Sequence, residues 1–519
     1  MNLSRLANLL VSAFEKNEIQ PAHGIDINPV ISELASWYEK LRNAMDYREE
    51  EVVRRAAIER ILKRRLFFWG SGEKIAPPLI RELLWARYFP ESIIEESEVA
   101  KVAKTINLYL KLREELHKKE KEIPTNIDEL LYYLLSAKIE TMLNKDKSMD
   151  LFSTFLFHIL QDHIGILDDT PQNRDLQIFL AVRRSFAKDD IAFLKFRLFE
   201  QYFGELKEEN LVSIVANFPK VYQDMEKQLQ YPLKDRIASY VKKQIPSFLI
   251  MVEIFRKNKA EVRSLIANPQ ELKNAIYKTA EERYKTISTK VRNGIIRAVF
   301  FILLTKVIFA FSIEATYDNL VFGHIVWKSL AINIFTPPLI MVLVSLFIRT
   351  PDIKNTNRIY AKIQNILFTE KPLLDKPLVI TLKPEKRNPV LDFAFKFFWL
   401  LAFALSFGII LFVLDKLQFN IVSKGIFVFF LAIVSFFTYR ISQTANVYAV
   451  WEKEALTTPI IDFLFMPIVQ VGRRFTEGLS QINIFLYVFD YLIETPFKEL
   501  FGFLEQWFFF LRTKREELG

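Results

Sequence analysis

The chain has 519 residues, of which 51% are hydrophobic and 25% are charged. This combination is too apolar for an ordinary soluble protein and too charged for one that lies wholly in a membrane, so two compositionally different parts are expected. The absence of cysteine excludes disulfides, thiolate metal sites and cysteine nucleophiles. The net charge of +9 fits a protein whose basic residues lie beside an anionic membrane surface.

The N-terminal half has the periodicity of charged helices and no long apolar run. Residues 1–14 form a short amphipathic stretch without a cleavage site, so they predict a helix and not a signal peptide. Asn126 and Glu129 have the spacing of a capping box, which predicts a helix start there. Residues 1–268 therefore predict a large helical cytoplasmic domain, with helices expected near 29–47, 91–120, 126–144, 149–167, 189–203, 211–229 and 233–256.

The segment from Tyr47 to Phe68 is strongly basic, which raises the alternatives of nucleic-acid and lipid binding. Acidic residues lie four positions before several of these basic residues, as Glu59 lies before Lys63. That order stabilises a solvated helix, so a solvated helix is the favoured interpretation and no nucleic-acid partner is expected.

A long helix is expected to lead from the N-terminal domain into the membrane. The start of this helix is marked by three residues in favoured positions: Asn268 as the N-cap, Pro269 as the first helical residue and Glu271 as the third. An apolar stripe then continues without a break to about Ile313. Residues 269–294 are therefore predicted to form a helical stalk that enters the first membrane span.

Four apolar stretches are predicted to cross a membrane, which makes the fold class all-α and polytopic. The spans expected from hydropathy lie within residues 295–445, at about 295–313, 330–348, 393–414 and 425–439. The fourth span is short for about 30 Å of hydrocarbon.

The charges of the connecting loops predict the orientation. The loop at 349–391 is rich in Lys and Arg, whereas 314–323 contains neither. The positive-inside rule then puts both termini in the cytoplasm of a multi-pass protein of the plasma (inner) membrane. Within the basic loop, prolines flank residues 378–382, which predicts one short extended segment.

Residues 446–519 are too polar to span a membrane and too apolar to be free in solution. In this region, charged residues interrupt stripes of apolar residues that have helical spacing. This pattern favours amphipathic helices that lie in the membrane interface and contact anionic lipids. The alternative is that these helices pack on the soluble domain.

Lys306 is the candidate intramembrane charge. A lysine in a span costs about 2.5–3.5 kcal/mol on insertion scales, which suggests a function, with Glu314 or Asp415 as a partner. The alternative is that the side chain snorkels to the outer interface two turns away. Thr336, Pro337 and Pro338 are expected to break the second span, as in transporters, although prolines also serve packing in membrane helices.

His158, Asp162 and His163 are the candidate metal ligands. His158 and Asp162 lie one helical turn apart, but the spacing matches no zinc-hydrolase pattern and the apolar neighbours favour an ordinary buried helix. No catalytic motif is present, so no cofactor is expected and an enzyme is disfavoured. Small residues in spans three and four, such as Ala402, Ser406 and Ala432, predict close helix packing.

The favoured function is a membrane-anchored scaffold or interaction protein that presents its helical domain to a protein partner at the cytoplasmic face. The alternative is a transporter or channel component in which Lys306 and the break at Thr336, Pro337 and Pro338 line a path. Four spans with one deep charge suit an anchor better than a pore. Homo-oligomerisation, which could still build a pore, is left open by the sequence.

Overall fold

The computed structural model describes residues 3–16, 25, 27–45, 50–68, 70–90, 94–118, 126–346, 348–374, 376–382, 389–450, 458–481 and 495–517. Within these residues the regular structure is helical apart from two short strands, so the all-α prediction is confirmed. The residue contacts divide the chain into two compact units, each of which is described by itself. The N-terminal unit comprises residues 3–242, 370–382 and 484–519, and the hydrophobic unit comprises 243–369 and 383–483. This division differs from the expected domains, because part of the basic loop and the last helix belong to the N-terminal unit.

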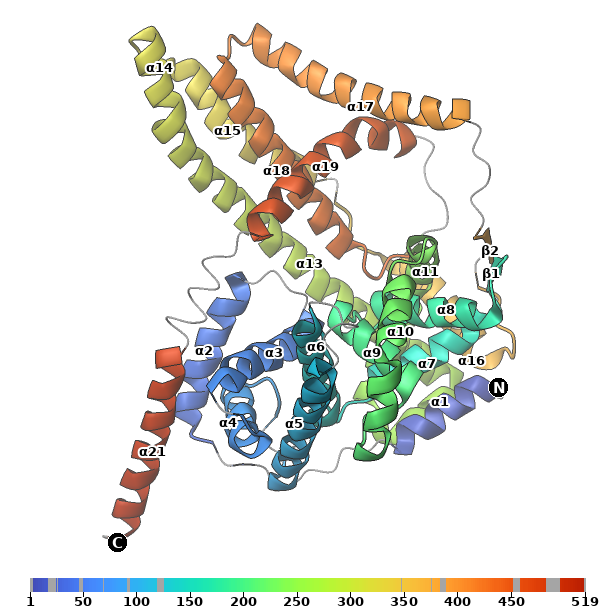
Figure 1. The fold of residues 1–519 in the computed structure, drawn as a ribbon. Helices are drawn as coiled ribbons and strands as arrows, with labels where there is room; N and C mark the ends of the chain where they lie inside the picture. Colours follow the sequence, from blue (N-terminus) through green and yellow to red (C-terminus); the bar gives the residue numbers. More distant parts are fainter. Residues whose placement is uncertain are drawn as a thin grey trace. The chain divides into compact units, whose positions relative to one another are not determined.

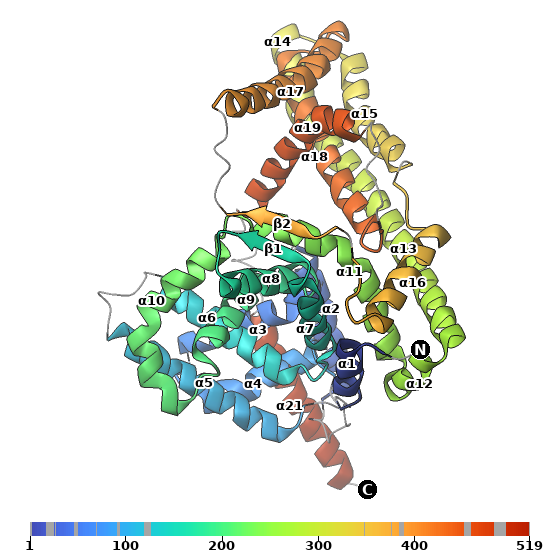
Figure 2. The same ribbon diagram turned by 90° about the vertical axis from the view of Figure 1, so that its right-hand side faces the viewer.

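The N-terminal unit is a stack of helices with one small sheet (Figures 1 and 2). Its elements are α1 (Arg5–Lys16), α2 (Pro29–Met45), α3 (Glu50–Phe68), α4 (Gly72–Trp85), α5 (Glu96–His117), α6 (Ile127–Leu143), α7 (Ser148–Gln161), β1 (Ile164–Leu167), α8 (Pro171–Ser185), α9 (Ile191–Phe203), η3 (Glu208–Asn210), α10 (Leu211–Leu229), the first part of α11 (Lys234–Lys257), β2 (Leu378–Thr381) and α21 (Thr495–Glu517).

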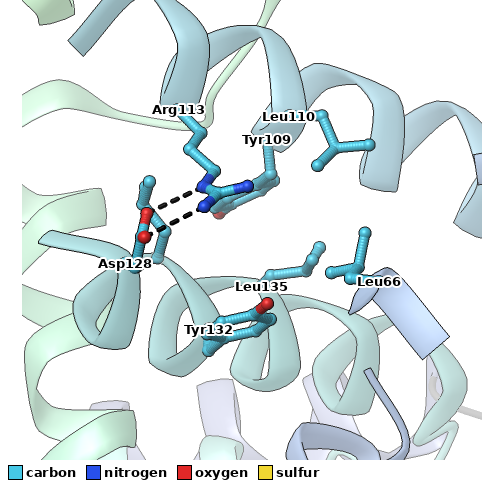
Figure 3. Close-up of a pocket in the computed structure, with 8 residues that line it drawn as sticks. Leu66, Tyr109, Leu110, Arg113, Asp128, Tyr132 and Leu135 are labelled. Carbon is cyan, nitrogen blue, oxygen red and sulfur yellow. Dashed lines mark hydrogen bonds and ion pairs between the residues drawn. The ribbon is translucent and has the colours of Figure 1, made fainter. Parts of the chain in front are cut away.

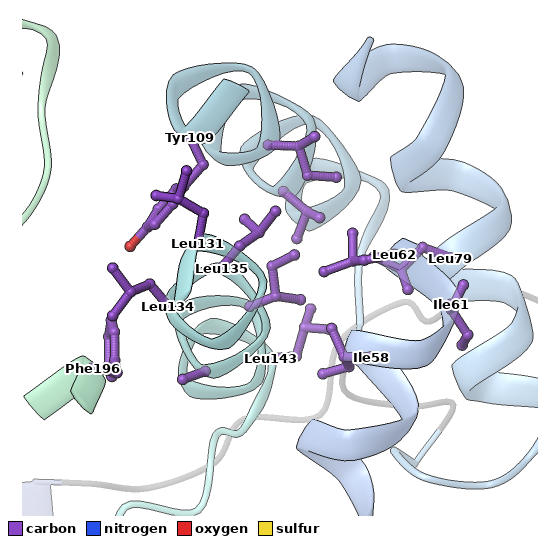
Figure 4. Packing of buried hydrophobic residues seen from close by; sticks show 14 of the residues in the cluster. Ile58, Ile61, Leu62, Leu79, Tyr109, Leu131, Leu134, Leu135, Leu143 and Phe196 are labelled. Carbon is purple, nitrogen blue, oxygen red and sulfur yellow. The ribbon is translucent and has the colours of Figure 1, made fainter. Parts of the chain in front are cut away.

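The core of this unit lies between α3, α4, α5, α6 and α9. Figure 4 shows Ile58, Leu62 and Leu79 facing the leucines of α6, with Tyr109 and Phe196 at the far side. Leucine and isoleucine recur at helical spacing on each of these helices, so each buries one stripe against its neighbours. Burial of apolar area at about 25 cal/mol per Å² is the main stabilising term of such a stack.

The strands β1 and β2 form a parallel pair in which Ile164 is opposite Leu378 (Figure 2). The expected short extended segment at 378–382 is therefore present. The helix expected over 149–167 ends at Gln161 instead. The last four residues of the expected range, Ile164–Leu167, form the strand β1. The reason is tertiary: the amide of Leu378 donates to the carbonyl of His163 at 2.8 Å and begins a ladder that a helix could not accept.

Helix starts were predicted better than helix caps. Asn268 accepts hydrogen bonds from the amides of Gln270 and Glu271, as expected. Asn126 precedes α6, but its side chain makes no capping bond, and Glu129 instead accepts a hydrogen bond from Tyr133 at 2.5 Å. The start of α6 is thus correct, whereas the predicted capping box is wrong.

The hydrophobic unit is built on one long helix that Figure 1 shows in yellow-green. Its elements are the end of α11, η4 (Lys259–Glu261), α12 (Val262–Ala267), α13 (Pro269–Phe309), the π-helix η5 (Ala310–Glu314), α14 (Ala315–Phe322), α15 (Trp327–Ser345), α16 (Ile353–Phe368), α17 (Pro389–Lys416), α18 (Ile421–Ala445) and α19 (Thr458–Gln481). The helix from Pro269 continues through η5 to Phe322, a total of 54 residues, so it is longer than predicted.

Four of the described helices are long and apolar enough to cross a membrane: residues 269–322, α15, α17 and α18. These correspond to the four predicted spans. The fourth is not short, since α18 has 25 residues. Many of the large apolar side chains of α13 and α17 are exposed, which is the expected surface of a helix that faces lipid.

The small residues of spans three and four contact α19, and not mainly each other as expected. Ser406 donates a hydrogen bond to the carbonyl of Leu464 at 2.7 Å, and Gly472 lies directly against the backbone of Ala432. One part of the region expected in the membrane interface is therefore packed against two apolar helices.

Candidate functional site: a buried polar cluster among the apolar helices

The helices α13, α15 and α18 pack on one another around a small apolar layer. Ile302, Met341, Phe430 and Val434 are buried in this layer. Directly beyond it lies a group of polar side chains, which we call the Lys306 cluster: the buried Lys306, Glu314, Asp318, Ser329, Asn333 and Ser423, together with the half-buried Asn420.

Lys306 and Glu314 form the ion pair at the centre of this cluster. The Nζ of Lys306 lies 3.3 Å from Oε1 of Glu314, and the two side chains are 0% and 1% exposed. The ammonium also lies 4.7 Å from the centre of the Phe430 ring, which attracts a cation through its face. The charge of Lys306 is therefore compensated inside the protein.

The carboxylate of Glu314 connects three helices. Its Oε2 accepts hydrogen bonds from Nδ2 of Asn333 on α15 and, at 3.2 Å, from Oγ of Ser423 on α18. The same amide of Asn333 lies 3.3 Å from the carbonyl oxygen of Ser423. Because a buried carboxylate without donors is costly, these contacts favour one arrangement of the three helices.

Asp318 makes a second link one turn further along. Its Oδ1 accepts from Nδ2 of Asn420 at 2.7 Å, and its Oδ2 accepts from the amide of Val326 at 3.2 Å. The segment 314–323, expected to be the loop outside the membrane, is largely helical, and the turn follows Gly323, which has the left-handed conformation at φ 71°.

Snorkelling does not describe Lys306 in this structure. The helix continues to Phe322, well beyond the end expected near Ile313, and the lysine side chain is fully buried. Of the two partners considered, Glu314 is the one that pairs. Asp415 instead pairs with Lys424 at 2.6 Å, and its side chain is 71% exposed.

The expected helix break at Thr336, Pro337 and Pro338 is not present, because α15 continues through both prolines as a helix. Neither proline has an amide hydrogen, so neither can donate to the carbonyl four residues earlier, at Asn333 and Ile334. Membrane helices tolerate such losses when neighbouring helices pack closely, and both prolines are buried.

Two polar atoms in this region have no hydrogen-bond partner among the described residues. They are Oδ1 of Asn333 and Oγ of Ser329, one turn apart on α15. A buried acceptor without a donor is rare in folded proteins, and it often marks a strained or functional position. The π-helix η5 next to the cluster is a second such mark.

The candidate metal ligands are not brought together. The Nδ1 atom of His158 is 3.0 Å from Oε1 of Gln161, and Nδ1 of His163 is 2.9 Å from the carbonyl of Ile159. In the part of the chain that the structure describes, no three His, Asp or Glu side chains gather in a way that could hold a metal ion.

The basic helix α3 is not a solvated charge surface, so that interpretation is wrong. Arg55 pairs with Glu59 and Asp190, Arg60 with Glu39, and both Arg64 and Arg65 with Glu82. The expected pair of Glu59 and Lys63 does form, at 2.5 Å. The arginines are largely buried because acidic residues of α2, α4 and α9 compensate them, which periodicity on α3 alone could not indicate.

A small pocket in the N-terminal unit lies between α5 and α6 (Figure 3). Arg113 and Asp128 close one side of it with two hydrogen bonds, of 2.7 and 2.9 Å, and two tyrosines and four leucines line the rest. The hydrogen bonds from Arg113 lower the pKa of Asp128 to about 2. With a volume of about 20 Å³, the pocket has room for about one water molecule and not for a larger ligand.

The sequence pointed to Lys306 and to Glu314 as one of two partners, but it missed Asn333, Ser423 and Asp318. Asn333 was the available signal, because an amide in the middle of an apolar span needs a partner. Chemically, the Lys306 cluster can hold charges of both signs away from water and connect three helices.

No protein-family model, curated protein or solved structure matches this chain.

Proposed function

We propose that the chain is a membrane-anchored scaffold whose apolar helices form a closed, internally paired anchor for the helical N-terminal unit. The observation that carries this proposal is the pairing inside the Lys306 cluster. Lys306, Glu314, Asn333 and Ser423 direct their polar groups at one another, and all four are buried. Such a cluster favours one packing of the helices and leaves the charge of Lys306 with a partner.

The N-terminal unit supplies the surface that the anchor would present. Helix α2 exposes Val30, Leu34 and Trp37 at helical spacing, and Trp37 is 65% exposed. Exposed apolar stripes on an otherwise charged helical stack are typical of protein contact surfaces. The proposed location is the cytoplasmic face of a plasma (inner) membrane, supported by the basic loop after α15.

A transporter or channel component is the second candidate. It is favoured by the unpartnered Oδ1 of Asn333 beside a buried ion pair and a π-helix. Ionisable groups in such surroundings act as relays for protons or ions in membrane proteins.

Reconstitution of the full chain into liposomes separates the two functions. An anchor is expected to add no proton, sodium or potassium flux to that of protein-free liposomes, across a range of imposed gradients. The Glu314→Gln and Lys306→Met double variant should then behave as the wild type does. Flux through the wild type that the double variant abolishes, while inserting equally well, would replace the scaffold by the transporter.

A further inference from the structure

The last helix of the chain, α21, has two apolar faces with different surroundings. One face packs on the N-terminal unit: Phe501 is 4% exposed there, and Leu504 and Phe508 pack against the same core. The other face carries Leu500, Phe503, Trp507 and Phe510, which are all exposed.

The inner face is held by specific polar contacts. Lys498 lies 2.9 Å from Glu39 of α2, and each side chain is only 3% exposed. Further along, Nε1 of Trp85 donates to Glu505 at 3.0 Å. The ring of Phe497 stacks on Tyr38 with centres 5.7 Å apart. These contacts fix which face of α21 is turned toward α2 and α4.

The outer face follows from the helical geometry. The docked residues 498, 501, 505 and 508 are spaced by three and four, and so are the exposed residues 500, 503, 507 and 510. The two sets are offset by two positions, which is about 200° around a helix of 3.6 residues per turn. The exposed set therefore lies nearly opposite the docked one, with the exposed polar residues Glu499, Gln506 and Thr513 along one side.

The composition of the outer face matches an anionic bilayer surface. Aromatic residues prefer the headgroup region, and the stripe ends at the exposed Lys514 and Arg515. Basic residues beside an apolar stripe add attraction to anionic lipid. The same chain also carries four apolar helices long enough to cross a membrane.

We propose that α21 is a two-sided clamp, whose inner face holds the N-terminal unit while its outer aromatic stripe inserts into the anionic surface of the bilayer. This inference rests on the proposed membrane anchor. If the clamp proposal is wrong, α21 will make no contact with lipid. If the anchor proposal is wrong, the full chain in liposomes will conduct ions.

The test uses the full chain in liposomes, with single cysteines in a protein that has none of its own. An environment-sensitive fluorophore is attached at Trp507→Cys on the outer stripe or at Thr513→Cys on the polar side, six positions later and about 120° away around the helix. A nitroxide-labelled lipid should quench the fluorophore at 507 about twofold or more strongly than at 513, and iodide in the water should do the reverse. Vesicles of neutral lipid alone should reduce the difference.

A matched variant separates the two faces. Leu500→Ser with Phe503→Ser should remove lipid quenching at 507 while hydrogen exchange of α21 stays slow, because the contacts of Lys498 and Glu505 are intact. Three results would overturn the proposal. The first is iodide access at both labels, and the second is unchanged lipid quenching in the variant. The third is protection of the label at 507 from both quenchers, which would indicate a protein partner or a second copy.

Discussion

Lys306 and Glu314 are eight positions apart on one continuous helix, yet their side chains meet at 3.3 Å. In a regular α-helix, two side chains eight positions apart point in directions that differ by about 80° around the helix axis. The π-helix at Ala310–Glu314 holds more residues in its turn and acts as the insertion of about one residue. Glu314 is thereby returned to the face of Lys306, so the π-helix and the ion pair depend on each other.

Removing one member of this pair is expected to destabilise the hydrophobic unit. Lys306→Leu leaves Glu314 buried without its cation, and breaking a buried pair costs about 3–5 kcal/mol. The thermal unfolding of detergent-solubilised protein should show this loss, and the added change Glu314→Gln should restore much of it. The exposed pair provides a control, since Asp415→Asn should change stability little. Equal stability of Lys306→Leu and the wild type would contradict the pairing.

Substitution of Asn333 is also expected to destabilise the hydrophobic unit, although this residue is uncharged. Asn333→Leu removes a donor to Glu314, and a buried acceptor that loses its donor costs about 1–3 kcal/mol. Asn333→Asp should be worse, because it puts a second carboxylate against Glu314. Thermal unfolding in detergent measures both, and a stabilising Asn333→Asp would argue against a buried, ionised Glu314.

Gly472→Ala is expected to disturb the packing of α19. A Cβ at this position would overlap the carbonyl group of Ala432 on α18, and a backbone obstacle cannot rotate away. Overpacking of this kind costs about 1–3 kcal/mol. Gly408→Ala on α17 is the control, because open space surrounds its position and alanine favours a helix. Equal unfolding temperatures of the two variants would show that α19 does not pack so closely.

The docking of α21 should weaken in acid. Burial would raise the pKa of Glu39, but Arg60 and Lys498 outweigh it and hold this pKa well below its ordinary value of 4.5. A lowered pKa contributes stability that is present above pH 4.5 and is lost as the pH falls toward the folded value. The protection of residues 495–517 against hydrogen exchange, taken relative to the intrinsic exchange rate at each pH, should therefore fall below about pH 4.5. Glu39→Gln should show fast exchange already at neutral pH, whereas Glu499→Gln, on the exposed side, should behave as wild type.

The proposed topology can be tested in intact cells. His324 lies in the exposed turn after α14, so His324→Cys gives an accessible labelling position on that side. This cysteine should react with a membrane-impermeant reagent from outside, whereas Lys371→Cys should react only after the cells are opened. The reverse pattern would invert the orientation.

The helical class, the four apolar stretches and most helix starts could be predicted from the amino-acid sequence. These depend on local periodicity, hydropathy and capping residues, which act over a few turns. Asn268 caps α13 as predicted for this reason, and α10 spans Leu211–Leu229 as expected.

Which polar groups contact one another could not be predicted in this way, because it depends on how distant helices pack. The arginines of α3 are buried because carboxylates from other helices compensate them, and β1 exists because a segment more than 200 residues later pairs with it. In the same way Glu314 belongs to the long helix and not to a loop, and Lys306, Asn333 and Ser423 surround its carboxylate. A buried charge is stable only with its partners in place, and those partners come from helices far apart in the chain.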